Sequence, residues 1–470
     1  MKINEIKRIK IKKKIRYLKT VFIFMILFFM FFIIFEKVEE EAIGELEPVI
    51  SEIAAEDKYI IKIDYPIIEN EVMHKKIKEY IDSQKEEFLN MVSKLEARDD
   101  FKYDFIAQNQ VFTLEDITTV YVLIYYYTGG NHYIRLDKTY HYNEKTNEEI
   151  DITYFLKDDN SLQKLSSSAY YYVMKFAENE GRTFNESFVK RGTEPIIENY
   201  SHFSFRDDGL KILFPPYQVA SWADGEIEIM IPYSELHNIV KDEYIKLATQ
   251  KEECDIVVPA KRDLKQFEGK KLIAFTFDDG PNPTTTNELL KGLDKYNAKV
   301  TFFVLGSRAL QFKSTIKDIY EKGHQIGSHT YNHLNLLNLN EYQIMKEIID
   351  TNKEIEKIIG VQPTLIRPPF GNTNKEIRKM SNMNTILWDV DTLDWKTRNA
   401  EKVEKEILSN AHDGAIILLH DIYGTSIKGA LSAMEKLEKE GYAFVTIEEM
   451  AEHRTINLDT EIIYYNFKSK

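Results

Sequence analysis

Several side chains able to bind a metal ion and to move protons gather in the C-terminal half of this 470-residue chain. Asp278 and Asp279 end an apolar run, and His329 and His333 follow about fifty residues later. Two imidazoles four positions apart can share one face of a helical turn and bind one metal ion, although this spacing is also common on helix surfaces. With one aspartate they make three protein ligands and leave a position for water, which suits Zn²⁺. The spacing therefore indicates an open metal site.

The elements that must position these residues form a regular alternation. Seven short apolar runs alternate with helical stretches between residues 271 and 455: 272–277, 300–305, 325–328, 364–367, 385–390, 415–419 and 443–447. This pattern favours a parallel α/β sheet, with fewer units than the usual eight of a closed barrel. We expect an α/β fold of deformed (β/α)7-barrel type, preceded by an α+β domain and an N-terminal transmembrane helix.

Further polar side chains stand at the ends of these predicted strands, in addition to the two aspartates and His329: Arg367, Asp391, Asp394, His420 and Asp421. The carboxyl ends of parallel strands meet at one face, where barrel enzymes collect their active sites. We therefore expect Arg367 to pair with Asp278, and His420 to do acid–base work rather than to fill the core. His324 and His412 precede strands, at the opposite face, and are expected to be structural.

Five motifs of this region carry a family resemblance. TFDDGP, HTYNH, RPPFG, DTLDW and ILLHD occur in this order over about 180 residues. They resemble the ordered motifs of the polysaccharide deacetylases, also called the NodB-homology or carbohydrate esterase 4 family. The resemblance implies metal-dependent removal of acetyl groups from N-acetyl sugars.

The resemblance also implies roles for the first three motifs. Asp278 would be the general base, and Arg367 would orient it. Asp279 would bind the metal together with His329 and His333. The expected ion is Zn²⁺, with Co²⁺, Ni²⁺ or Mn²⁺ as alternatives.

The remaining roles that the resemblance implies concern the acid and the substrate. His420 would be the general acid, tuned by Asp394, and the backbone amide of Phe370, where many members have Tyr, would help to form the oxyanion hole. Asp391 is an additional carboxylate without an assigned role. Three residues would bind the substrate: Trp395, Leu418 and Pro368.

The N-terminal segment predicts a membrane anchor. Residues 1–20 contain nine Lys or Arg and one Glu, whereas the whole chain has a net charge of −14. Residues 21–35 are apolar without a break, and charged residues rather than small ones follow them, so an uncleaved signal anchor is favoured over a cleaved signal peptide. We expect a cytoplasmic segment over 1–18, a single membrane span over 19–36, a stalk over 37–56, and everything beyond it outside the cell membrane.

Residues 57–250 have the mixed pattern of an α+β module, before a linker over 251–270, the catalytic region over 271–455 and a tail over 456–470. The stretches TGGNH and FPPYQVASWADGEIEIMIPYSEL resemble an extracellular module found beside peptidoglycan deacetylases and in some anti-sigma-factor ectodomains. The resemblance implies no chemistry and leaves the ligand of the module unknown. His132 and His141 are read as turn and strand histidines rather than metal ligands, and Tyr125–Tyr127 as core aromatics rather than a sugar platform.

These observations together predict a membrane-anchored peptidoglycan N-deacetylase that acts on glycan strands and not on nucleic acid. The motifs do not distinguish N-acetylglucosamine from N-acetylmuramic acid. Deacetylation of chitin, xylan or an exopolysaccharide is the alternative within the family. A non-catalytic wall-binding ectodomain is the alternative outside it, and the presence of Asp278, His329, His333 and His420 argues against that alternative.

Overall fold

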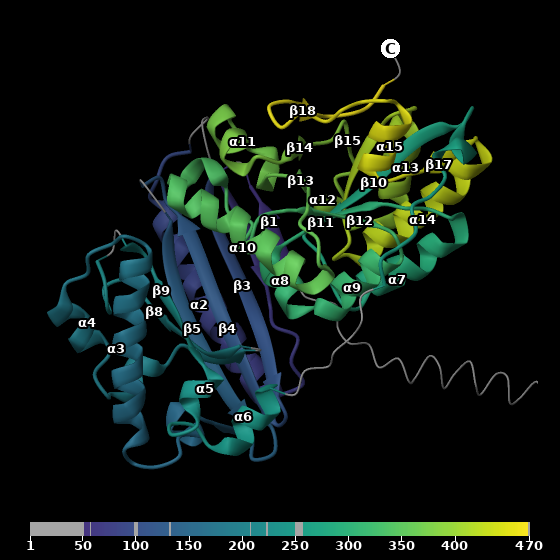
Figure 1. Ribbon diagram of the computed structural model, residues 1–470. Coiled ribbons are helices and arrows are strands. Elements are labelled where there is room, and N and C mark those ends of the chain that lie inside the picture. The colour runs from purple at the N-terminus through teal and green to yellow at the C-terminus, as the bar shows by residue number, and fades with distance from the viewer. Residues whose placement is uncertain are drawn as a thin grey trace, which may run out of the picture. The chain divides into compact units, whose positions relative to one another are not determined.

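The computed structural model describes residues 51–56, 58–97, 102–130, 133–206, 208–221, 224–249 and 257–468 (Figure 1). The predicted cytoplasmic segment, the membrane span, most of the stalk and His132 lie outside these residues. Within the described ranges, no helix is both long enough and apolar enough to cross a membrane.

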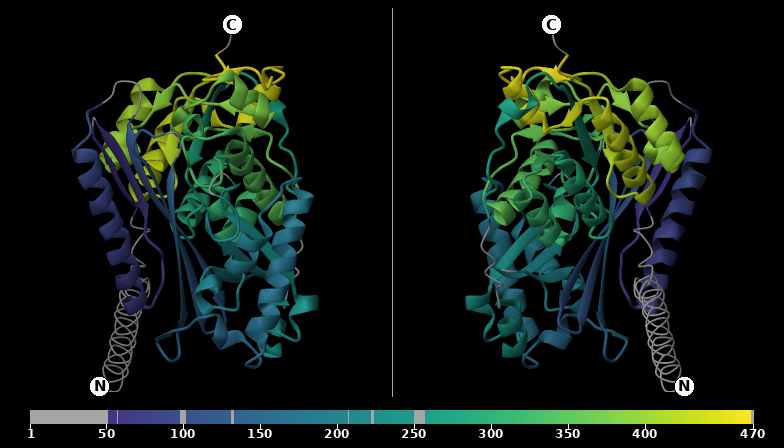
Figure 2. Two further views of the ribbon diagram at one scale, coloured as in Figure 1. Left: turned by 90° about the vertical axis from the view of Figure 1, so that its left-hand side faces the viewer. Right: turned by 90° about the vertical axis from the view of Figure 1, so that its right-hand side faces the viewer.

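The first sheet has six strands, paired in chain order: β1 (Ser51–Ala55), β2 (Tyr59–Asp64), β3 (Tyr103–Leu114), β4 (Ile117–Tyr127), β5 (Ile134–Asn143) and β6 (Glu148–Glu149). The long helix α2 (Glu71–Ser93) runs along one face of this sheet (Figures 1 and 2). Because strand side chains alternate between faces, Ile61 and Ile63 pack in the core with α2, while Lys62 and Asp64 point the other way. Both charged residues are nevertheless buried, at 3% and 4% exposure.

A second, antiparallel sheet has its own core. Its strands β7 (Phe203–Arg206), β8 (Gly209–Phe214) and β9 (Ile227–Pro232) share this core with α3 (Ser161–Asn179). Short helices complete it: η1 (Ile152–Phe155), α4 (Glu186–Gly192), η2 (Ile197–Tyr200), α5 (Tyr233–Leu236) and α6 (Asp242–Thr249). The region expected to be one α+β module therefore contains two sheets.

His141 is a core histidine, as the sequence interpretation favoured. Its ring stacks on Phe203 at a centroid distance of 3.9 Å, and its Nδ1 lies 3.0 Å from the hydroxyl of Thr119. Burial lowers the pKa of His141 to about 3. Tyr125 is buried as well, in an apolar cluster with Ile106, so it packs rather than presenting a face to sugars.

The C-terminal sheet is parallel along the path β15-β16-β10-β11-β12-β13-β14-β18, with β17 beside the start of β10. Its strands are β10 (Lys271–Asp278), β11 (Thr301–Val304), β12 (Gln325–Ser328), β13 (Leu365–Ile366), β14 (Asn384–Ile386), β15 (Val390–Asp391), β16 (Ile416–His420), β17 (Tyr442–Phe444) and β18 (Ile463–Tyr464). β10 pairs on both sides and is buried after its first residue, which explains its mainly apolar sequence. The predicted α/β class is confirmed.

Two details of this sheet differ from the prediction. The strand expected over 385–390 is split, because β14 pairs with β13 while β15 crosses to pair with β16. β18 comes from the expected tail and pairs with β14. Among the described strands no pairing joins β18 to β15, so the sheet is an open, half-barrel arrangement and not a closed ring.

Helices cover this sheet: η4 (Leu264–Phe267), α7 (Thr285–Leu293), η5 (Asp294–Tyr296), α8 (Gly306–Gln311), α9 (Lys313–Glu321), η6 (Leu336–Asn338), α10 (Glu341–Ile359), η7 (Pro369–Gly371), α11 (Lys375–Ser381), α12 (Asp394–Thr397), α13 (Ala400–Asn410), α14 (Gly424–Lys439) and α15 (Ile447–His453). α10 begins with a capping box between Asn340 and Gln343 and ends at Gly360, whose φ is 76°. These caps fix the helix that supports the loop between His329 and His333 described below.

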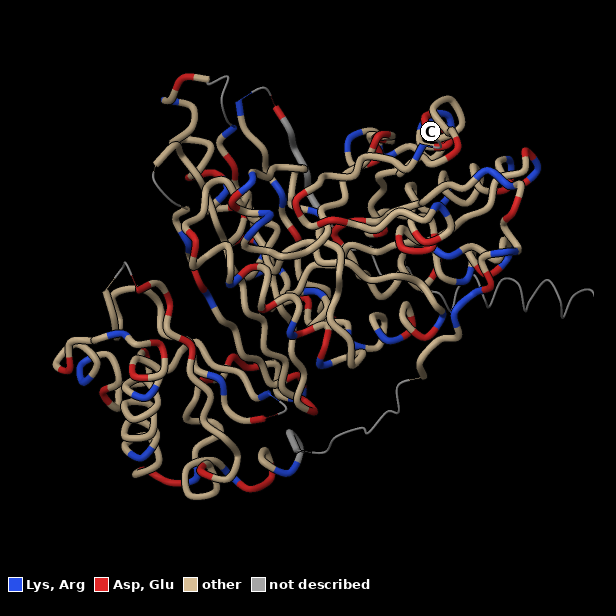
Figure 3. The backbone as a smooth tube through the Cα atoms, turned by 45° about the horizontal axis from the view of Figure 1, so that its top comes forward, with Lys and Arg blue, Asp and Glu red and all other residues tan. Residues whose placement is uncertain are grey.

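Acidic and basic side chains are interspersed along the described chain (Figure 3). Several exposed helix pairs are four residues apart, such as Lys78 with Asp82 and Lys439 with Glu435. Such pairs contribute little stability each, and the charges that matter for the site are the buried ones.

Candidate active site

The ends of neighbouring strands bring the two aspartates and His420 together. In the register of the sheet, Asp278 stands beside Phe303 of β11 on one side and beside His420 of β16 on the other. Asp279 follows β10 with a φ of 71°, a left-handed conformation that only Gly, Asn and Asp adopt at small cost. This turn directs two consecutive carboxylates into one site.

The two histidines lie on an irregular loop after β12, and the expected helical turn is not formed. Thr330 and His333 have φ values of 68° and 56°, conformations that a bulky or β-branched residue adopts only under strain. The ring centroids of His329 and His333 are nevertheless only 4.9 Å apart. A loop rather than a helix brings the two rings together.

Glu347 of α10 holds this loop, and no motif pointed to it. One of its carboxylate oxygens accepts hydrogen bonds from the backbone N–H groups of Tyr331, at 2.9 Å, and Asn332, at 2.7 Å. The other accepts from the side-chain amide of Asn332 at 2.8 Å. Glu347 is buried, and burial raises its pKa against the opposing effect of these hydrogen bonds. The Glu347 carboxylate thus accepts the hydrogen bonds of backbone N–H groups that carbonyl oxygens would accept in a regular helix.

Asp279, His329 and His333 form a group whose candidate ligand atoms all lie within 4.8 Å of one another. These three residues are called the metal-ligand group below. His329 Nδ1 donates to the backbone oxygen of Arg367 at 2.6 Å, so its Nε2 carries a lone pair. This Nε2 lies 3.6 Å from Asp279 Oδ1, and His333 Nε2 lies 3.3 Å from the same oxygen. Acceptors that converge in this way need a cation between them, so the donor set fits a divalent metal ion.

The protonation states agree with this interpretation. Burial lowers the pKa of His329 and, more strongly, that of His333, which favours the neutral rings that metals bind. Burial would raise the pKa of Asp279, but the ammonium group of Lys62 and the protonated ring of His420 hold it well below its usual range. Lys62 Nζ lies 2.8 Å from Asp279 Oδ1. This lysine comes from β2, more than two hundred residues earlier in the chain.

The pairing predicted between Arg367 and Asp278 is present. Arg367 is fully buried, and its Nη1 donates to Asp278 Oδ1 at 2.7 Å and to the hydroxyl of Thr276 at 2.8 Å. Its Nε and Nη2 donate to the backbone oxygens of Ile386 and Leu387 at 3.1 and 3.0 Å. The guanidinium group is therefore fixed on several sides and leaves Asp278 Oδ2 facing the metal-ligand group, 3.8 Å from His329 Nε2.

His420 and Asp394 form the opposite wall of the site. Asp394 Oδ1 lies 2.8 Å from His420 Nδ1, and Oδ2 accepts from the backbone N–H of His420 at 2.8 Å. Burial opposes protonation of His420, but Asp394 outweighs it, and together with Asp279 and Asp278 raises its pKa to about 9. His420 Nε2 points toward the metal-ligand group, 4.0 Å from Asp279 Oδ2. A protonated imidazole thus faces the carboxylate of Asp279.

Comparison with known proteins identifies the family. Residues 265–386 match the model of the family described as Polysaccharide deacetylase, and residues 154–234 match Protein of unknown function (DUF3298). The peptidoglycan-N-acetylmuramic acid deacetylase PdaC of Bacillus subtilis (strain 168) is 35% identical over 400 residues, 83% of this chain and 85% of that protein. The chain belongs to the polysaccharide deacetylase family.

Further relatives match a smaller share of this deacetylase. The peptidoglycan-N-acetylglucosamine deacetylase PgdA of Listeria monocytogenes serotype 1/2a (strain 10403S) is 43% identical over 180 residues, 38% of this chain and 39% of that protein. A solved structure of PdaC from Bacillus subtilis is 44% identical, covers 40% of this chain and 93% of its own, and superposes with a TM-score of 0.39.

The remaining predicted residues of the deacetylase site lie on elements that adjoin these groups. Phe370 has a φ of 61° and is 36% exposed, and its ring meets that of His333 at a centroid distance of 4.8 Å. Leu418 is buried in β16, and Trp395 is half-buried on α12, which contacts β16. Pro368 is buried directly after Arg367. Phe370 therefore lies at the open side of the metal-ligand group.

Three other predicted residues make their hydrogen bonds with groups outside the acid–base pairs. Asp391 accepts a hydrogen bond from the backbone N–H of Leu393 at 2.9 Å, and burial raises its pKa. His324 Nδ1 accepts from the backbone N–H of Val300 at 3.2 Å, and His412 Nε2 lies 2.9 Å from Asp389. His324 and His412 have the structural contacts that were expected of them.

Proposed function

We propose that this deacetylase removes N-acetyl groups from the amino sugars of peptidoglycan and releases acetate. The observation that carries the proposal is the convergence of three groups of ionisable side chains at the carboxyl ends of the strands. These groups are an arginine-held carboxylate, an Asp-His-His ligand group and an aspartate-held imidazolium. The first lies 3.8 Å from the second, between Asp278 Oδ2 and His329 Nε2. The third lies 4.0 Å from the second, between His420 Nε2 and Asp279 Oδ2. Relatives named as peptidoglycan deacetylases, one of them aligned over most of both chains, support peptidoglycan as the substrate.

Asp278 would act as the general base. Arg367 occupies its Oδ1, so Oδ2 is the atom that can take a proton from a water molecule between it and the acetyl carbon. Asp279, His329 and His333 would hold the metal, with Zn²⁺ expected and Co²⁺, Ni²⁺ or Mn²⁺ as alternatives. When bound, this ion would polarise the acetyl carbonyl and make nearby water more acidic.

His420 would act as the general acid. Its Nδ1 is engaged by Asp394, so Nε2 is the atom that gives a proton to the departing sugar nitrogen. Breakage of the amide C–N bond then leaves acetate and a free amine on the sugar. The backbone N–H of Phe370 would donate to the oxyanion of the tetrahedral intermediate, and Trp395, Leu418 and Pro368 would surround the acetyl methyl group.

We also propose that the enzyme acts at the outer face of the cell membrane on glycan strands. The basic residues 1–18 and the apolar run 21–35 support this placement, because they have the charge order and length of a signal anchor. The anchor would keep the catalytic region close to the cell wall.

Acetate release from purified peptidoglycan by the full chain, supplied with zinc, tests the proposal. We expect release by the wild type and a loss of at least about 10²-fold in Asp278→Asn, the smallest effect usual for a general base. Asp294→Asn, at a half-exposed ion pair with Lys322, is the matched control and should behave as wild type. Equal release by Asp278→Asn would refute the mechanism, and no release by the wild type from any wall glycan would refute the function.

A further inference from the structure

Lys62 of the six-stranded sheet lies in the metal-ligand group of the deacetylase. Its Nζ is 2.8 Å from Asp279 Oδ1, the same oxygen that both histidine Nε2 atoms approach. Lys62 and Asp279 are 3% and 2% exposed. A lysine is almost never buried to this degree without a specific partner, and here the partner is a residue that would bind the metal.

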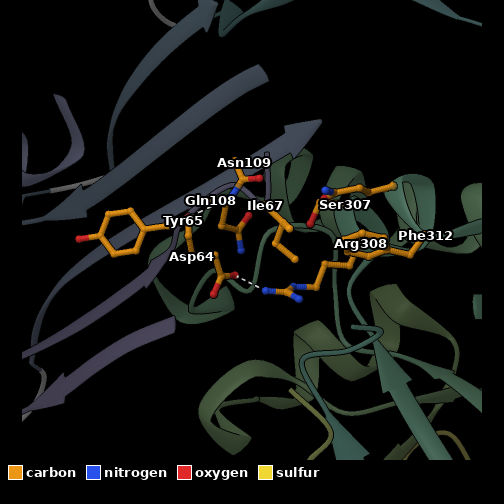
Figure 4. Close-up of a pocket in the computed structure, with 9 residues that line it drawn as sticks. Asp64, Tyr65, Ile67, Gln108, Asn109, Ser307, Arg308 and Phe312 are labelled. Atoms are coloured by element: carbon orange, nitrogen blue, oxygen red, sulfur yellow. Dashed lines mark hydrogen bonds and ion pairs between the residues drawn. The ribbon is translucent and has the colours of Figure 1, made fainter. Parts of the chain in front are cut away.

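The sheet presents this lysine through the alternation of β2. Ile61 and Ile63 pack toward α2, so Lys62 and Asp64 share the opposite face. Asp64 makes a second buried ion pair with the catalytic region, to Arg308 of α8 at 2.8 Å. Figure 4 shows Asp64 and Arg308 pointing toward each other in a pocket that Gln108 of β3 also lines. Two charged residues of one strand thus reach two different elements of the catalytic region.

The same face of the sheet rests on the loop that carries His333. Gln108 Nε2 donates to the backbone oxygen of Asn332 at 2.8 Å. Leu334 joins an apolar cluster with Ile106, Leu123 and Tyr125 of the sheet. The contact therefore combines ion pairs, a hydrogen bond and apolar packing, and it is centred on the metal-ligand loop.

We propose that the six-stranded sheet is an autoinhibitory element of this deacetylase, in which the Lys62 ammonium group competes with the divalent metal ion for Asp279. The inference rests on the proposed function of the Asp-His-His group. A metal ion held by this group needs the Asp279 oxygen that Lys62 contacts, and two positive charges at one buried oxygen repel each other strongly. Metal binding would therefore displace Lys62 and weaken the docking of the sheet.

Zinc binding to the full chain, measured by isothermal titration calorimetry, tests the proposal without relying on turnover. Removing the charge in Lys62→Met should tighten zinc binding by at least about tenfold, since one charge within ~4–6 Å changes proton binding to a carboxylate by that much or more. Lys62→Arg keeps a positive charge and should not tighten it. Lys75→Met, on the exposed side of α2, is the matched control and should equal the wild type.

Thermal unfolding of the same proteins gives an independent measurement. Without metal, Lys62→Met leaves Asp279 buried beside uncharged partners, so its melting temperature should be lower than that of the wild type. Saturating zinc should raise the melting temperature of this variant more than that of the wild type. If Lys62 competes with the metal, the variant should have both the lower melting temperature without metal and the larger rise with zinc. If Lys62 only holds the sheet in place, the variant should have a lower melting temperature than the wild type both without metal and with zinc.

Asp64→Asn keeps Lys62 and removes the other buried ion pair, so it covers the case in which Lys62→Met does not fold. Asp64→Asn should also tighten zinc binding. Its effect on zinc affinity should be less than additive with that of Lys62→Met, because both substitutions weaken the same contact between the six-stranded sheet and the catalytic region. Equal zinc affinities in wild type, Lys62→Met and Asp64→Asn would overturn the inference and leave deacetylation intact. Failure of all of them to bind zinc would overturn the metal site of the proposed function, and the inference with it.

Discussion

Asp394→Asn probes the general acid of this deacetylase. An ordinary histidine has a pKa of 6.5, and His420 has one of about 9, a difference worth about 3 kcal/mol at 1.36 kcal/mol per pH unit. Among the groups that raise this pKa, Asp394 is the largest contributor, ahead of Asp279 and Asp278. A metal ion would offset the contributions of the latter two, so Asp394 is the partner on which the protonated state depends.

Without the Asp394 charge, burial is the dominant influence and should bring the pKa of His420 below 6.5. A general acid must be protonated to act, so activity is present below its pKa and is lost as the pH rises through it. In Asp394→Asn we expect the alkaline limb of the kcat/KM profile to move down by about two pH units or more. At pH 7 a pKa below 6.5 leaves less than about a quarter of His420 protonated, so we expect activity to fall by at least about fourfold.

The assay is acetate release from soluble glycan fragments at a series of pH values, with zinc binding measured in parallel. Asp391→Asn is the matched control, because this nearby carboxylate hydrogen-bonds to the backbone of Leu393 and not to His420. An alkaline limb at the same pH in wild type and Asp394→Asn would refute the assignment of His420 as an acid tuned by Asp394.

Two further substitutions test the support of the site. Glu347→Gln removes the carboxylate charge that accepts three hydrogen bonds from the loop between the histidines. It should weaken zinc binding in calorimetry by about 10–100-fold while the fold is retained. An unchanged zinc affinity would show that Glu347 does not position the ligands. Arg367→Met leaves the Asp278 carboxylate buried without its partner, and should lower the free energy of unfolding in urea by about 3–5 kcal/mol. A loss below about 1 kcal/mol would show that the pair is not a buried charge pair of the expected kind.

The strand-end residues of this site were predictable from the sequence because parallel strands impose a common edge. Asp278, Arg367 and His420 each lie at the carboxyl end of a parallel strand. Because these ends lie at the same edge of the sheet, the three side chains are expected to lie close together. The family motifs added the roles. The α/β class followed from the same alternation of apolar runs and helices.

Other features were not predictable, for physical reasons that differ from case to case. The run 385–390 has the composition of one strand, but its two ends pair with strands on opposite sides of the sheet, and composition does not encode pairing partners. The spacing of His329 and His333 fits a helical turn, but their loop contains two residues with positive φ. Glu347 supports that loop from a helix without any motif of its own. Lys62 reaches the site from another sheet, and a lone lysine in a strand carries no local sign of its partner.

The central claim is that these strand ends form one metal-dependent deacetylase site that acts on peptidoglycan. Mass spectrometry of muropeptides, after treatment of purified peptidoglycan with the full chain, tests it most directly. The account predicts products that lack one acetyl group when zinc is present, and intact muropeptides when a chelator has removed the metal or when Asp278→Asn replaces the wild type. Deacetylated muropeptides at equal yield in the chelated protein or in the variant would contradict it.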